Sequence, residues 1–232
     1  IVRDGWGYSE NPYGNLIMEA KTPNADRYLK EYPSALLKCI GNDVGNPEGM
    51  QGGSEVGHLT LGAGRIVWQP QELINQSIVS GDFFENPALM SAIENCKKNN
   101  SALHLAGLFS DAGVHSDIRQ LFALMELAKK NGLSKVFIHL VLDGRDVPEK
   151  SAIGYVEQLN KKIEEMGFGK IASIVGRYYA MDRDTNWDRT GEARDLWTLG
   201  KGFESDEVMK AVNEAYKRGD ETDYYVKPIV IK

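Results

Sequence analysis

Residues 135–146 read KVFIHLVLDGRD, an apolar run that leads directly into charged residues and a glycine. Residues 135–142 are almost continuously aliphatic or aromatic. A strand that is buried on both faces has this pattern, because neither face alternates toward water. The segment therefore predicts an internal strand of a parallel sheet, with Asp143, Arg145 and Asp146 directly after its carboxyl end.

The chain on both sides of this strand alternates between strand and helix patterns. We expect further strands at residues 101–108 and 170–175. Helical spacing of apolar residues, or capping residues, predicts helices at residues 86–99, from Asp117 to Gly132, at 151–166 and at 205–218. Strands and helices in alternation are typical of βαβ units. We therefore predict the α/β class, with parallel-type sheets and flanking helices in three layers.

Polar side chains follow each predicted strand, at the edge where such sheets bind ligands. They are Ser110, Asp111 and His115 after the first strand, Asp143, Arg145 and Asp146 after the second, and Arg177 and Arg183 after the third. Three arginines at one edge favour an anionic substrate held by bidentate hydrogen bonds. Ion pairs with the neighbouring aspartates are the competing interpretation. His115 is a candidate acid, base or hydrogen-bond donor to a phosphate. The alternative is a structural loop histidine.

The N-terminal part of the chain is rich in glycine. The sequence holds 24 glycines, and eight of them fall between Gly41 and Gly64. We expect a first strand at residues 1–3, a helix at 22–32 with a proline in its first turn, and a short strand at 35–40. From there to residue 65 we expect a long loop, which in a compact chain is more often functional than idle.

Ser54 lies inside this glycine-rich segment, in the sequence GGSEVG. Glycines on its amino side leave the hydroxyl bare and let backbone N–H groups surround a phosphate or an oxyanion. The alternative is a flexible turn, since the spacing matches neither the G-x-S-x-G elbow nor a P-loop. Asp4, directly after the first predicted strand, is a candidate ligand for a hard cation. Its alternative is a carboxylate that caps loop amides.

Composition excludes several classes of protein. With 42% hydrophobic and 26% charged residues in 232 positions, the chain is globular rather than disordered or fibrous, and long enough for one large domain or two small ones. The net charge of −6 argues against a general nucleic-acid or anionic-membrane binder. No apolar run approaches the ~20 residues that span a bilayer. The first residues lack the basic-then-apolar pattern of a signal peptide, and the two cysteines lack metal-binding neighbours, so we expect a cytoplasmic protein.

Several segments together resemble the cofactor-independent, that is 2,3-bisphosphoglycerate-independent, phosphoglycerate mutase family. The matching stretches are DGWG at 4–7, AKTPN at 20–24, GGSEVGH at 52–58, GAGR at 62–65, SDAGVHS at 110–116, DGRD at 143–146 and GRYYAMDRD at 176–184. The resemblance implies an isomerase of glycolysis and gluconeogenesis that interconverts 3-phosphoglycerate and 2-phosphoglycerate through a phosphoserine. It also implies a small-molecule substrate, no nucleic-acid or membrane partner, and a cytoplasmic monomer.

The resemblance implies a role for each matched residue. Ser54 is expected to be the nucleophile and also a metal ligand, and Asp4 a second metal ligand. Two Mn²⁺ ions are the expected cofactors, with Mg²⁺ or Co²⁺ as alternatives, and 2,3-bisphosphoglycerate is not required. The substrate-binding set is expected to be His115, Arg145, Asp146, Arg177 and Arg183. Residues 1–68 are expected to open a phosphatase-like domain of the alkaline phosphatase superfamily, and residues 69–232 to form most of an inserted transferase domain.

The sequence departs from the family pattern in ways that bear on activity. Gly53, Leu73 and Ala112 stand where the family usually carries Asn, Arg and Gly. Family members are also about twice as long, and the missing half carries most metal-binding residues, so this chain alone is expected to be inactive. Two alternatives remain: a metal-dependent phosphatase of the same superfamily, and a phosphoglycerate-binding fragment without catalysis.

Overall fold

The computed structural model describes residues 1–232, and the chain divides into two compact units, Ile1–Glu72 and Leu73–Lys232. No helix of the structure is both long enough and apolar enough to cross a membrane.

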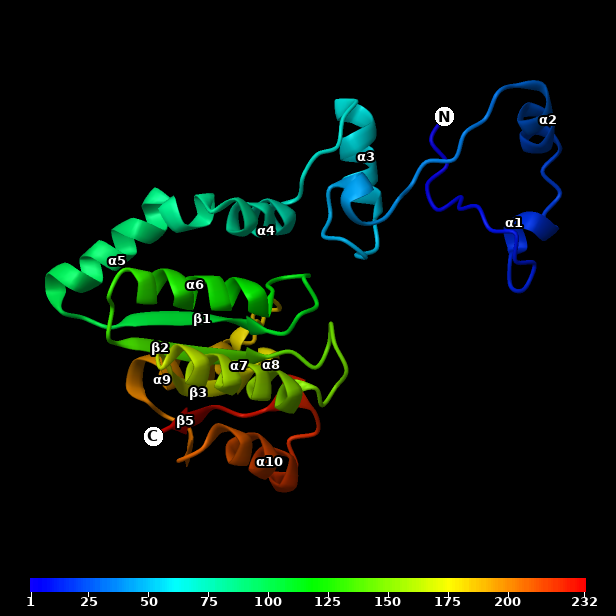
Figure 1. The fold of residues 1–232 in the computed structure, drawn as a ribbon. Coiled ribbons are helices and arrows are strands. Elements are labelled where there is room, and N and C mark those ends of the chain that lie inside the picture. The colour runs from blue at the N-terminus through cyan, green and yellow to red at the C-terminus, as the bar shows by residue number, and fades with distance from the viewer. The chain divides into compact units, whose positions relative to one another are not determined.

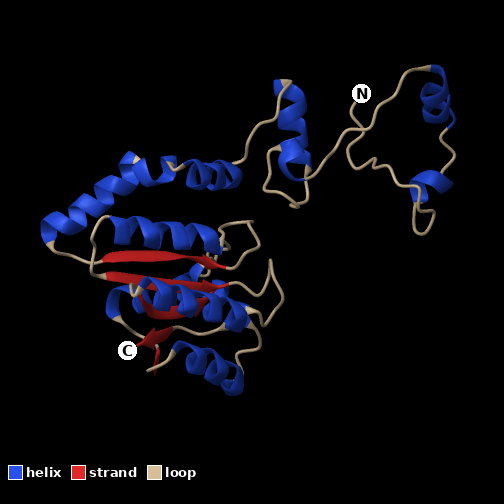
Figure 2. Ribbon diagram, viewed as in Figure 1, coloured by secondary structure: helices blue, strands red, loops and turns tan.

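The second unit is built around a sheet of five strands in the order β1-β2-β3-β5-β4. Its strands are β1 (Leu103–Phe109), β2 (Val136–Leu142), β3 (Lys170–Gly176), β4 (Phe203–Ser205) and β5 (Ile229–Ile231). β1, β2 and β3 pair in parallel, β5 runs antiparallel to β3, and β4 pairs in parallel with β5. The three predicted parallel strands are thus confirmed, and their carboxyl ends lie at one edge of the sheet (Figure 2).

Helices cover both faces of this sheet, which confirms the predicted layered α/β class. One core joins β1, β2 and β3 to α5 (Pro87–Asn99), α6 (Ile118–Lys130), α7 (Ala152–Met166) and α10 (Val208–Arg218). A smaller core on the other face joins the sheet to α8 (Arg177–Ala180) and α9 (Trp187–Leu199). Figure 1 shows α6 lying along β1. Leu140 of β2 faces the larger core and Val141 faces the smaller one, as the pattern of a doubly buried strand requires.

Helix ends follow the capping signals of the sequence. The side chain of Asn86 accepts the N–H groups of Ala88 and Leu89 at the start of α5, and that of Asp117 accepts the N–H of Arg119 at the start of α6. These bonds satisfy donors that have no partner inside the helix. Gly167 ends α7 in the left-handed conformation, which glycine adopts without steric cost.

Some elements of the second unit were not predicted. The helix expected from residue 205 begins at Val208, because Glu207 is its N-cap and Ser205 belongs to β4. α4 (Pro70–Ser80), η2 (Asp82–Glu85), α9, β4 and β5 were also not predicted. α9 lacks a clear apolar stripe, and the two short strands hold only three residues each, too few for a periodic pattern.

The first unit differs more from expectation. α2 (Pro23–Glu31) confirms the predicted helix, and α1 (Leu16–Glu19) precedes it. The strands predicted at 1–3 and 35–40 are wrong: residues 1–3 are exposed and pair with no strand, and the second segment keeps only one bridge, from Ile40 to Gln51. A strand needs a hydrogen-bonding neighbour, and the described chain offers none.

The long loop predicted from residue 40 to 65 is also partly wrong. It contains η1 (Gly41–Val44) and the ten-residue helix α3 (Ser54–Ala63), which ends at Gly64 in the left-handed conformation. Two glycines inside α3 lower its helix propensity, so the sequence does not mark this helix clearly. Close packing explains the glycine at position 52, because a Cβ added there would lie 1.9 Å from the carbonyl oxygen of Cys39.

Replacing Leu140 by alanine should lower the free energy of unfolding by about 2–5 kcal/mol, because the cavity left in a tightly packed core is only partly refilled. Leu140 is 1% exposed at the centre of the sheet. The matched control is Leu199→Ala at the end of α9, where the side chain is 60% exposed. Urea unfolding monitored by circular dichroism measures both variants. Equal losses would contradict the placement of Leu140 in the main core.

Candidate functional site

Three polar side chains follow the carboxyl ends of the three parallel strands and meet there. Ser110 follows β1, Asp143 follows β2 and Arg177 follows β3. The Ser110 hydroxyl donates to Oδ2 of Asp143 at 2.7 Å, and Nη1 of Arg177 donates to Oδ1 of the same carboxylate at 2.6 Å. All three side chains are buried. The strand ends are therefore tied together by charge-assisted hydrogen bonds.

Asp143 also shapes the loop that follows β2. Its Oδ1 atom accepts the backbone N–H groups of Arg145 at 3.2 Å and of Asp146 at 3.0 Å. Burial by itself raises the pKa of the Asp143 carboxyl. The hydrogen bonds from Asp146, Ser110, Arg177 and Arg145 outweigh burial and lower that pKa below its usual value. Asp143 is therefore an anion at neutral pH and fixes the turn that carries Arg145.

Arg177 joins this buried anion to the predicted substrate-binding residues. Its Nη1 atom also donates to Oδ2 of Asp146 at 2.7 Å, and Nε2 of His115 lies 3.9 Å from the same oxygen. Burial alone lowers the pKa of the Arg177 guanidinium, but Asp146 and Asp143 raise it above its usual value. The structure thus brings His115, Asp146 and Arg177 together.

Arg145 and Arg183 differ from Arg177 because their guanidinium groups are exposed and make no hydrogen bond or ion pair in the structure. The loop that carries Arg183 is held by Asp182, which accepts the N–H of Asn186 at 2.8 Å and its amide Nδ2 at 2.7 Å. The Asn186 amide lowers the pKa of Asp182. Each free guanidinium therefore lies on a loop that a preceding aspartate holds through backbone N–H groups.

Ser54 lies in the first unit, as the first residue of α3. Gly53 is the N-cap and has no side chain to satisfy the N–H groups of the first turn. Those N–H groups and the helix dipole favour an anion beside the Ser54 hydroxyl. Sequence reasoning placed Ser54 in a loop, so the helix is a feature that it missed.

His58 contacts Ser54 from the next turn of α3. Its Nδ1 atom lies 2.7 Å from the backbone oxygen of Ser54 and 3.2 Å from the hydroxyl oxygen. A carbonyl oxygen can only accept, so the shorter contact requires that Nδ1 carries the proton. In this arrangement Nδ1 donates toward both oxygens and does not act as a base for the hydroxyl. The i, i+4 spacing of Ser54 and His58 was the available signal.

The chain does not by itself supply the metal site that the resemblance implies. Asp4 is exposed and its carboxylate has no hydrogen-bond or ion-pair partner. No group of three or more His, Cys, Asp or Glu side chains converges anywhere in the structure. Asp4 and Ser54 would provide at most two of the oxygen ligands that a hard cation requires. These residues therefore do not form a complete metal site.

Ser110 was recognised from the sequence only as a residue at a strand end, and Asp143 only as one of the aspartates that could pair with the arginines. That competing interpretation is confirmed for Arg177, which pairs with Asp143 and Asp146. A neighbouring contact was also missed: the Tyr155 hydroxyl of α7 donates to Asp111, which follows Ser110. Burial is the larger cause, and the hydrogen bond to Asp111 the next, of a pKa of Tyr155 that is raised to about 12. Position after a strand was the only available signal, because sequence separation hides which strand ends become neighbours.

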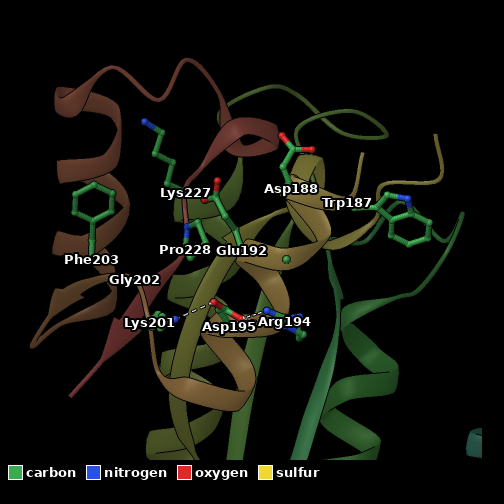
Figure 3. Close-up of a pocket in the computed structure, with 11 residues that line it drawn as sticks. Trp187, Asp188, Glu192, Arg194, Asp195, Lys201, Gly202, Phe203, Lys227 and Pro228 are labelled. Carbon is green, nitrogen blue, oxygen red and sulfur yellow. Dashed lines mark hydrogen bonds and ion pairs between the residues drawn. The ribbon is translucent and has the colours of Figure 1, made fainter. Parts of the chain in front are cut away.

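A separate cavity of about 560 Å³ lies between α9 and the residues next to β4 and β5 (Figure 3). Asp195 pairs there with Arg194 at 2.5 Å and with Lys201 at 3.1 Å. None of the predicted site residues lines this cavity. The candidate site is therefore the edge of the sheet rather than this cavity.

Replacing Arg177 by methionine should lower the free energy of unfolding by about 3–5 kcal/mol, because it leaves a buried carboxylate without its partner. The folded-state pKa of Asp143 is depressed. Its stabilisation is therefore complete above the unfolded pKa of about 4 and is lost as pH falls through the folded pKa. The difference between wild type and variant should be largest at neutral pH and should narrow below pH ~4.

Urea unfolding at several pH values measures this difference. Arg194→Met is the matched control, because its ion pair with Asp195 is on the surface and its side chain is 69% exposed. A pH-independent loss in the Arg177 variant would show that its effect does not come from the Asp143 carboxylate.

The family profile described as "BPG-independent PGAM N-terminus" matches residues 74–232 of this chain. A 2,3-bisphosphoglycerate-independent phosphoglycerate mutase 1 from Methanosarcina acetivorans is 55% identical over 232 residues, which are 100% of this chain and 45% of the relative. A 2,3-bisphosphoglycerate-independent phosphoglycerate mutase from Acetivibrio thermocellus is 51% identical over 231 residues, again 100% of this chain and 45% of the relative.

Similarity extends to a solved structure. A crystal structure of Leishmania mexicana phosphoglycerate mutase at low cobalt concentration matches with a TM-score of 0.76 and 31% identity, over 91% of this chain and 40% of that chain. The chain spans about half the length of the curated relatives that it matches. The family profile, the relatives and the shared fold agree, and the chain belongs to the 2,3-bisphosphoglycerate-independent phosphoglycerate mutase family, whose N-terminal part it matches.

Proposed function

We propose that this chain is the N-terminal part of an isomerase that interconverts 3-phosphoglycerate and 2-phosphoglycerate in glycolysis and gluconeogenesis without 2,3-bisphosphoglycerate. The observation that carries the proposal is the 55% identity, over all of the chain, to a relative with that name. Such identity over the whole length of the chain is more specific than a shared fold, because one fold can host many functions. The assignment of a cytoplasmic monomer belongs to the same proposal and rests on the family resemblance.

The second unit would bind the glycerate. Arg145 and Arg183 have free guanidinium groups, which suit the carboxylate or phosphate of a phosphoglycerate. His115 is half-exposed beside Asp146, where it can donate to the same ligand. Arg177 and Asp146 complete the proposed set. Since Nη1 of Arg177 already donates to two carboxylates, this arginine would contribute mainly by holding Asp146 in place.

The first unit would carry the phosphoryl group. In our proposal the Ser54 oxygen attacks phosphorus, the bond from phosphorus to the glycerate oxygen breaks, and that oxygen gains a proton while the serine hydroxyl loses one. The other hydroxyl of the glycerate then attacks phosphorus and loses its proton, the bond from phosphorus to the Ser54 oxygen breaks, and the serine oxygen regains a proton. The uncapped N–H groups of α3 support this role, because they stabilise charge on the transferring phosphoryl oxygens.

We further propose that Asp4 and Ser54 become Mn²⁺ ligands only together with further residues. Those residues would correspond to the part of the relatives that this chain does not match. A metal would make the serine oxygen a better nucleophile. From the family resemblance we also propose that residues 1–68 belong to a phosphatase-like domain and residues 69–232 to a transferase domain.

Replacing Ser54 by alanine in the protein extended to the length of its relatives should abolish interconversion, because the first turn of α3 holds no other hydroxyl group. A coupled assay or ³¹P NMR measures turnover of 3-phosphoglycerate. The control is Ser34→Ala, which removes another exposed serine hydroxyl of the first unit. Retained activity in the Ser54 variant would remove the nucleophile from the proposal. Release of inorganic phosphate by the wild type in place of 2-phosphoglycerate would indicate the phosphatase alternative.

The 232-residue chain alone should bind 3-phosphoglycerate without converting it, with any divalent metal added. The proposed binding groups lie within the second unit, whereas the metal ligands are incomplete. Calorimetry with wild type and with the double variant Arg145→Ala and Arg183→Ala measures binding. Turnover by the chain alone would contradict the requirement for further residues. Equal binding by the double variant would exclude the two arginines from the site.

A further inference from the structure

The loop between β2 and α7 carries Arg145 and Asp146 and is anchored at both ends. At the β2 end, Asp143 accepts the backbone N–H groups of Arg145 and Asp146. At the α7 end, the N-cap residue Ser151 makes no capping bond with its own side chain. Since the first N–H groups of a buried helix end need acceptors, another part of the chain must supply one.

Asp223 supplies this acceptor from 71 residues further along the chain. Its Oδ2 atom accepts the N–H groups of Ser151 and Ala152, both at 2.8 Å, and its Oδ1 atom accepts the hydroxyl of Tyr216. Its own backbone N–H donates to the carbonyl oxygen of Glu149 at 2.8 Å. The side chain is 1% exposed. Asp223 therefore caps α7 and also holds the last residues of the loop.

The backbone next to Asp223 lies against the two glycines that directly precede Arg145 and Arg177. A Cβ added at Gly144 would lie 2.7 Å from the backbone nitrogen of Tyr224, and one added at Gly176 would lie 2.3 Å from its carbonyl oxygen. The N–H of Gly176 donates to the carbonyl oxygen of Val226 at 2.7 Å. The segment from Asp223 to Val226 is thus packed between the residues that precede Arg145 and Arg177.

We propose that Asp223 is a positioning residue for substrate binding, which holds the loop of residues 144–150 so that Arg145 meets the phosphoglycerate. The inference rests on the proposed function. Arg145 has no side-chain partner, so its backbone is the only part of the residue that the protein holds in place. Asp143 fixes one end of that backbone and Asp223 fixes the other.

Amide hydrogen exchange in the 232-residue chain tests the structural part. Asp223→Ala should speed exchange at the amides of Arg145 and Asp146, which Asp223 does not touch. The matched control is Glu207→Ala, because Glu207 also caps a helix by accepting two backbone N–H groups, those of Met209 and Lys210, but at the start of α10. Faster exchange only at Ser151 and Ala152, or equal effects in the two variants, would overturn the proposal.

Kinetics of the protein extended to the length of its relatives test the functional part. Asp223→Ala should raise KM for 3-phosphoglycerate about tenfold with little change in kcat, because loss of a contact shared by ground and transition states weakens binding alone. Asp223→Asn should restore KM, since its amide oxygen can accept both N–H groups and its NH₂ can face the Tyr216 oxygen. Glu207→Ala should leave KM unchanged.

Two further results separate the possible failures. If the extended wild-type protein does not interconvert the phosphoglycerates, the proposed function fails, and the exchange experiment still decides whether Asp223 holds the loop. If the wild type is active and Asp223→Ala has an unchanged KM, the positioning role is wrong. Should Asp223→Ala fail to fold, Tyr216→Phe removes one donor to Asp223 and should give a smaller change in exchange and KM in the same direction.

Discussion

The buried ion pair between Arg177 and Asp143 is the interaction on which the edge of the sheet depends. Its partners, with Ser110, come from the ends of three different strands and are almost fully buried. Charge in such a place is costly unless it is paired and hydrogen-bonded, so the three strand ends cannot move apart without exposing an unpaired ion. The loops that follow these strands therefore start from fixed positions, and this restricts the backbone positions of the exposed residues that they carry.

The arginines of this edge divide into two physical kinds. Arg177 is buried, with both of its carboxylate partners in place, and it organises the protein. Arg145 and Arg183 are exposed and free of protein partners, on loops that Asp143 and Asp182 hold by accepting backbone N–H groups. A free guanidinium can offer all five of its N–H donors to an anion, whereas Arg177 already gives part of its donors to two carboxylates. The same residue type thus stabilises the protein in one position and is proposed to bind the substrate in the other two.

Sequence periodicity predicted the helices and strands whose pattern depends only on residues close together in the chain. The apolar run of residues 135–142 predicted β2, and the Asp117 cap with the apolar spacing after it predicted α6. The helix predicted at residues 86–99 is α5. Ion pairs between the arginines and the aspartates were one of two interpretations, and the sequence could not show which arginine forms them, because residues 143 and 177 meet only when two strands pair. Asp223 was missed for the same reason. α3 was missed because glycines mask its pattern, and the strand predicted at residues 1–3 was wrong because a strand requires a neighbour that the described chain does not provide.

An enzyme that returns a phosphoryl group to the same molecule must keep the glycerate while the group is on the protein. The groups proposed to hold the glycerate, and the network that positions them, all lie within Leu73–Lys232. Ser54 and Asp4 lie in the other unit, where no cluster of metal-binding side chains is complete. On the proposed assignment, retention of the glycerate does not depend on the groups that transfer phosphate. Binding can survive when transfer is lost, which is why this chain is expected to bind a phosphoglycerate that it cannot convert.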